Sequence, residues 1–94
     1  MVISDENKKF LEGLLHYYIE QAESYNQFAN EYKEFSNSNR EIAFGVIVGT
    51  VYSAFLQTYS NQQLEVRLDD IQEFHEFMRD NIKKITKALD KKNP

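Results

Sequence analysis

The chain has 94 residues, of which 41% are hydrophobic, 28% charged and 14% aromatic, and its formal net charge at pH 7 is −4. This composition is that of one ordered globular domain, residues 1–94, rather than of a disordered tail, and the acidity argues against general nucleic-acid binding. The lack of cysteine excludes a disulfide framework and a thiolate metal site, so we expect a cytoplasmic protein.

Residues 5–36 are predicted to form one long amphipathic helix with Ser4 as its N-cap. Large residues recur in alternating steps of three and four, which is the spacing of a heptad-like seam. This seam consists of Leu11, Leu14, Tyr18, Gln21, Tyr25, Phe28, Tyr32 and Phe35. A second, mostly small line beside it, made of Leu15, Ala22 and Ala29, would let a neighbouring helix approach closely.

Residues 39–58 are predicted to form the middle helix. Ser38 and Glu41 have the spacing of a capping box, and the run from Ile42 to Leu56 carries no charge. Its only polar residues are Thr50, Tyr52 and Ser53, which cannot form a polar stripe, so the helix should be buried on all sides. Two helices of the same chain cannot surround it, and we therefore expect a homodimer or a larger homo-oligomer.

Small residues recur every four positions in this middle helix, at Gly45, Gly49 and Ser53. Such a ridge lets two backbones approach closely, and the cost of about 1 kcal/mol per glycine relative to alanine argues for a packing role. We expect the ridge to form either the crossing between two copies or the contact with the aromatic seam of the first helix. With Val48 and Tyr52, these residues are the candidates for an oligomer interface or a close helix contact.

Residues 61–90 are predicted to form a second long amphipathic helix. Its seam consists of Leu64, Leu68, Ile71, His75, Met78, Ile82, Ile85 and Leu89. A break from the middle helix is expected within 58–62, where Ser60 and Gln63 have capping-box spacing; without that break, residues 39–90 would form one helix. His75 interrupts an aliphatic seam, which makes it a candidate for fixing register or for a pH-sensitive switch, the alternative being a core histidine with satisfied hydrogen bonds.

The spacing of the titratable residues indicates no catalytic, metal-binding or cofactor-binding set. His16, with Glu12 and Glu20 four residues away on either side, is expected to be an exposed helix residue, because the paired Glu-x-x-His motifs of di-iron bundles are lacking. The acidic residues of the third helix are expected on a solvated face beside its seam. They are Asp69, Asp70, Glu73 and Glu76.

The C-terminal segment 79–94 carries six basic and two acidic residues. Cations near the end of a helix interact favourably with its dipole, which explains this composition without a ligand. An anionic partner for this segment is the alternative.

Together these patterns predict an all-α three-helix bundle, in which two long amphipathic helices flank an apolar middle helix and homo-oligomerisation completes the core. We expect a non-enzymatic interaction or oligomerisation module that acts as a small scaffold or adaptor, with itself or another protein as its partner and no cofactor.

One alternative is a small membrane-associated protein with a span near 42–60. It is disfavoured because fifteen helical residues reach only about 22 Å, whereas a bilayer core is about 30 Å thick. The other alternative is a small helical ligand-binding protein or enzyme with an apolar interior site.

Overall fold

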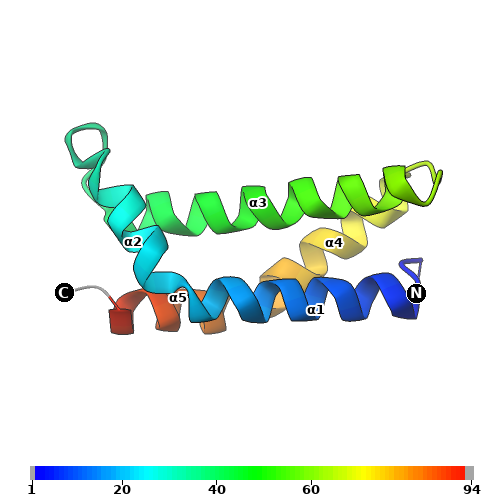
Figure 1. Cartoon of the computed structure of the whole chain (residues 1–94), viewed down its shortest axis with the longest axis horizontal. Helices are drawn as coiled ribbons and strands as arrows, with labels where there is room; N and C mark the ends of the chain where they lie inside the picture. The colour runs from blue at the N-terminus through cyan, green and yellow to red at the C-terminus, as the bar shows by residue number, and fades with distance from the viewer. Residues whose placement is uncertain (1, 93–94) are drawn as a thin grey trace.

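The computed structural model describes residues 2–92, which form five α-helices and one short 3₁₀ helix. In chain order these are α1 (Asp5–Glu20), α2 (Ala22–Asn30), η1 (Lys33–Phe35), α3 (Asn39–Asn61), α4 (Leu68–Asp80) and α5 (Ile82–Lys92). The prediction of an all-α fold is confirmed. Helix α3 runs along one long side of the molecule and α1 and α5 run along the other, while α4 crosses obliquely between them (Figure 1).

Local hydrogen bonds fix where the helices begin and end. Ser4 Oγ accepts the N–H of Asn7 at 3.1 Å, and Ser38 Oγ accepts the N–H of Glu41 at 3.2 Å, so both serines cap helix N-termini as predicted. At the other end of α3, Gln63 has a φ of 57°, in the left-handed region that closes many helices. The N–H of Leu64 there donates to the Tyr59 carbonyl at 2.9 Å. The chain therefore turns away from α3 within one residue of the predicted break.

Both segments predicted as long helices are divided in the structure. Segment 5–36 breaks at Gln21 and segment 61–90, which becomes helical only at Leu68, breaks at Asn81. Asn81 Nδ2 donates at 2.8 Å to the carbonyl of Phe77, which in a continuous helix would accept the backbone N–H of residue 81. That N–H instead donates to the Met78 carbonyl at 3.1 Å. This competition ends α4 and lets α5 leave in a new direction (Figure 1).

The core beneath α1 and α2 uses the small line together with Leu11 of the seam. Its buried residues are Leu11, Leu15, Ala22, Asn26 and Ala29. The expectation that the aromatic residues of the seam pack in the core is right for Tyr18 and Tyr25, which are half-buried against it, and wrong for Phe28 and Phe35, which are 48% and 81% exposed. Helix α2 packs against both α3 and α5, and its buried side chains, Ala22, Asn26 and Ala29, are small enough for that approach. Asn26 Nδ2 strengthens the contact by donating to the Leu89 carbonyl at 2.8 Å.

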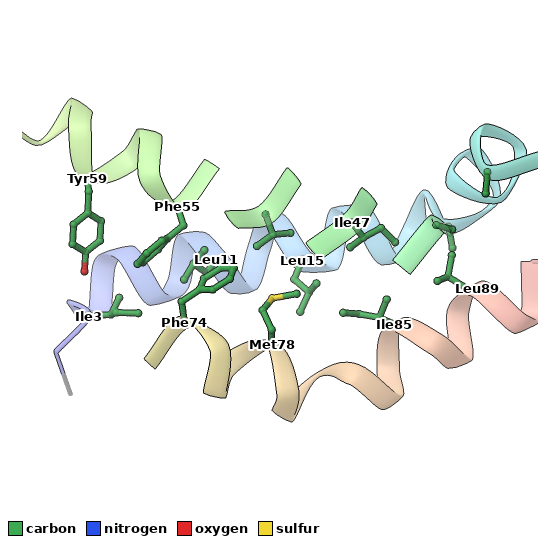
Figure 2. Packing of buried hydrophobic residues seen from close by; sticks show 14 residues of the cluster. Ile3, Leu11, Leu15, Ile47, Phe55, Tyr59, Phe74, Met78, Ile85 and Leu89 are labelled. Carbon is green, nitrogen blue, oxygen red and sulfur yellow. The ribbon is translucent and has the colours of Figure 1, made fainter. Parts of the chain in front are cut away.

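Side chains of α4 and α5 close the core from the remaining side, where they point toward α1 and α3 (Figure 2). The buried ones are Phe74, Met78, Ile85 and Leu89. The last three belong to the predicted seam, but in α4 the neighbouring Phe74 is buried while His75 is exposed. The break at Asn81 rotates α4 relative to α5, so that one continuous seam cannot serve both helices.

Polar side chains, among them the buried Asn7 and Asp70, tie the helices together. The side-chain amides of Asn7 and Gln62 exchange two hydrogen bonds of 2.9 and 2.8 Å, which join α1 to the end of α3. Asp70 accepts hydrogen bonds from Tyr59 Oη at 3.0 Å and from the N–H of Arg67 at 2.9 Å. Asp70 is buried, so its expected place on a solvated face is wrong. Burial, followed by the hydrogen bond to Asp70 and its negative charge, raises the pKa of Tyr59 to about 12.

Candidate functional site

Helix α3 buries one row of side chains and exposes the row on its opposite side. The buried row recurs every fourth residue and consists of Ala43, Ile47, Val51, Phe55 and Tyr59. Gly45, Gly49 and Ser53 each lie two residues beyond a member of that row, and all three are exposed. Two residues correspond to a rotation of about 200° around an α-helix. The small residues therefore point away from the core.

We call the exposed side of α3 its outer face, made of Gly45, Val46, Gly49, Tyr52, Ser53 and Leu56. The strip of small residues lies in the middle of this face. Half-buried Val46 lies on one side of the strip, and half-buried Tyr52 and 37% exposed Leu56 lie on the other. Thr50, next to this face, donates its hydroxyl to the Val46 carbonyl at 2.7 Å, so its polar group is satisfied within the helix. The result is a recessed, uncharged strip between two rows of larger side chains.

The two glycines of the outer face have no packing partner in the described part of the chain. A methyl group placed on Gly45 or Gly49 would meet no heavy atom of another segment within 4 Å. The expected contact between this ridge and the aromatic seam of the first helix, one of the two alternatives, is therefore wrong. Because glycine costs about 1 kcal/mol relative to alanine in a helix interior, the monomer carries this cost without a compensating contact.

The remaining interface candidates lie at the border of the outer face. Val48 and Tyr52 are half-buried and pack against the core. The Tyr52 ring is stacked with the imidazole of His75, with ring centroids 6.2 Å apart and an interplanar angle of 15°, and its centroid lies 5.1 Å from that of Phe74. His75 itself is exposed, which excludes a core position for it. Its role in register or pH sensing stays a prediction.

Within residues 2–92, no group of three or more histidine, cysteine, aspartate or glutamate side chains is placed to hold a metal ion. His16 Nε2 lies 3.0 Å from Glu20 Oε1, and both side chains are exposed. Glu73 Oε2 accepts the N–H groups of Val2 and Ile3 at 2.8 and 2.9 Å, so this carboxylate fastens the N-terminal segment to α4. Its role, like that of Asp70, depends on contacts between distant segments that helical spacing does not reveal.

Helix α3 is also the helix in the described region that is long and apolar enough to cross a membrane. Its 23 residues correspond to about 35 Å, so the length argument drawn from the fifteen-residue run underestimates its reach. Only 28% of its most apolar window is buried inside the molecule. Much of an apolar helix is therefore available for contact with something outside this chain.

The basic C-terminal segment forms the exposed side of α5. Its exposed cations include Lys83, Lys84, Lys87 and Lys91. Asp90 lies on the same helix and forms an ion pair with Arg40 of α3 at 2.9 Å, with both side chains about half exposed. Residues 93–94 lie outside the described residues, and an anionic partner for the segment stays a prediction.

Comparisons with protein-family models, curated proteins and solved structures found no match for this chain. Val46 and Leu56 are the members of the outer face that the sequence analysis did not assign to it. For Leu56, the helical spacing of three from Ser53 and seven from Gly49 could have indicated the position.

Proposed function

We propose that this protein is a non-catalytic helical module that self-associates through the outer face of α3 and serves as a small scaffold or adaptor. The observation that carries the proposal is the strip of Gly45, Gly49 and Ser53, which is exposed on an uncharged face and whose two glycines have no packing partner among the described residues. Strips of small residues let two helix backbones approach closely, which is a contact this chain alone does not provide.

The shape of the outer face favours a second copy of itself as the partner. In a two-fold symmetric contact, each recessed strip would receive the row of larger side chains, such as Tyr52 and Leu56, of the other copy. In this arrangement α1–α2, α3 and α4–α5 act as the three arms of a bundle, and the second copy covers the side of α3 that those arms leave open.

The test compares the wild-type chain with Gly49→Leu and with the control Gly13→Leu, by light scattering at micromolar concentration. Both glycines are exposed in helix interiors, and a methyl group on either would meet no heavy atom of another segment within 4 Å. We expect the wild type and the control to be dimers or larger, and Gly49→Leu to be a folded monomer, because a leucine would fill the strip. A monodisperse wild-type monomer, or equal assembly of the two variants, would contradict the proposal.

A second candidate is association of α3 with a membrane. Two observations favour it: α3 is 23 residues long, and only 28% of its most apolar stretch is buried inside the molecule. The glycines weigh against it, because a strip without side chains offers little apolar surface to lipid tails. A span would also separate α3 from α1, α2 and α5, against which it packs. Cell fractionation distinguishes the two candidates: a membrane protein would require detergent, whereas a self-associating module would stay in the supernatant.

A further inference from the structure

A groove with a cavity volume of about 790 Å³ runs between α1 and α4, and none of its lining residues belongs to α3. On α1 it extends from Lys8 to Ile19, and on the other side from Asp69 to Lys84. At 1.5 Å per residue, the α1 wall is about 17 Å long, or about three helical turns. The groove is thus a surface separate from the outer face of α3, with the length of a short helical segment.

The floor of the groove is apolar. Leu11 and Leu15 of α1 are buried there, and half-buried Ile19 and Phe77 line it while packing against the core. Ile19 and Phe77 come from opposite walls and are only half-buried, so an occupant could contact both of them, whereas Leu11 and Leu15 lie beneath with 1% and 3% of their surface exposed. Amphipathic helices bind in apolar grooves of this kind, where apolar side chains spaced three and four residues apart insert into the groove.

The walls of the groove are acidic. Its lining includes five carboxylates, namely Glu12, Asp69, Glu73, Glu76 and Asp80, but only two lysines, Lys8 and Lys84. Four of the five carboxylates are exposed, and Glu73 is half-buried. Within the described part of the chain, Glu76 and Asp80 form no ion pair. The lining of the groove therefore carries more negative than positive charge, with five carboxylates against two lysines.

One of these carboxylates is only partly satisfied. Glu73 Oε2 accepts two backbone N–H groups, whereas its Oε1 is shielded from water and has no hydrogen-bond partner among the described residues. A charge held in this way is costly, and a nearby cation reduces the cost. This adds a second reason for a cationic occupant.

We infer that the groove between α1 and α4 binds an amphipathic helix of a partner protein, with an apolar stripe for the floor and lysine or arginine for the walls. The basic helix α5 of a second copy does not fit this description, because its apolar residues Ile85 and Leu89 are buried in its own core. The inference assigns a partner class to the proposed adaptor, but it does not require self-association through α3.

The test measures fluorescence anisotropy of a labelled leucine–lysine peptide of about 14 residues, about 21 Å long as a helix, on addition of the full chain. Its leucines recur with helical spacing, and a shuffled peptide of the same composition lacks that period. We expect the periodic peptide to bind in a salt-dependent manner and the shuffled peptide to bind at least tenfold more weakly, a difference of about 1.4 kcal/mol.

The matched variants are Glu12→Gln with Glu76→Gln, on the two walls, and Glu34→Gln with Glu65→Gln, which are exposed residues outside the groove. Both pairs change the net charge equally. If each exposed charge contributes about two- to fivefold, the wall pair should weaken peptide binding about 4- to 25-fold, and the control pair should leave it unchanged. Circular dichroism verifies that both variants fold.

Absence of binding by the periodic peptide, equal binding of the shuffled peptide, or equal effects of the two variant pairs would overturn the inference. Displacement of the peptide by low concentrations of spermine would also overturn it, because the groove would then be a site for small polycations. These outcomes are distinct from a failure of self-association, since the wall variants leave α3 intact and the Gly49→Leu variant leaves the groove intact.

Discussion

The buried row and the exposed strip of α3 both recur every four residues, but the row is covered by other helices and the strip is not. The buried row contains Ile47, Val51 and Phe55, whose side chains fill space between the other helices, whereas Gly45, Gly49 and Ser53 fill almost none. The relation is reversed in α2, where Ala22 and Ala29 are buried because α3 and α5 lie close, while the larger Phe28 is exposed. The period of a pattern identifies a helix face, but the volume needed on each side decides which face is covered.

The largest expected effect is that of Phe55→Ala in the buried row. The Phe55 ring is only 1% exposed, and its centroid lies 5.0 Å from that of Phe74 and 4.9 Å from that of Tyr59. Removing it leaves a cavity, and we expect a loss of about 3 to 5 kcal/mol in the free energy of unfolding. Urea denaturation measures this loss, and Leu56→Ala on the outer face is the control that should cost much less in the single chain.

Tyr59→Phe tests the polar end of the buried row with a smaller change. The substitution removes the hydroxyl that donates to Asp70 Oδ1, and this buried carboxylate oxygen would then lack its hydrogen bond. We expect a loss of about 1 to 3 kcal/mol in unfolding free energy. A neutral effect would show that water replaces the hydroxyl at this position.

The same hydrogen bond predicts how stability changes at alkaline pH. The pKa of Tyr59 is about 12 in the folded chain and near the ordinary tyrosine value of 10.0 when unfolded, so between these values the unfolded state releases the proton first. Stability from this group is complete below pH 10 and falls as the pH rises toward 12. Denaturation midpoints of the wild type should decrease more steeply over this interval than those of Tyr59→Phe, and equal slopes would contradict the assignment.

The smallest effect is expected in the exposed strip, where Gly49→Ala should stabilise the dilute single chain by up to about 1 kcal/mol. The added methyl group meets no neighbour in the chain, and alanine loses less backbone entropy than glycine on folding. Gly13→Ala should stabilise the chain similarly. At concentrations that favour assembly, however, Gly49→Ala should be less stabilising than in dilute solution, because the added methyl group would obstruct the interface. The effect of Gly13→Ala on the thermal midpoint should not depend on concentration. If the two variants change the midpoint equally at every concentration, the evidence for an interface at the strip is removed.

Features fixed by neighbouring residues were predictable from the sequence. The caps at Ser4 and Ser38 and the end of α3 near Asn61 depend on hydrogen bonds within a few residues. The break at Asn81 was not predicted, although it too is local, because an asparagine inside a helix can either point to solvent or bond the carbonyl four residues earlier. The sequence also identified the strip of Gly45, Gly49 and Ser53 by its spacing.

By itself the sequence determined that the chain is helical, where α1 and α3 begin, and which side chains share a helix face. Only the tertiary structure decided which faces are covered. It turned Phe35 outward, buried Ala22 and Asp70, placed His75 against Tyr52, and opened the acidic groove between α1 and α4. The reason is physical: helix periodicity acts over a few residues, whereas burial depends on how closely segments distant in sequence approach one another.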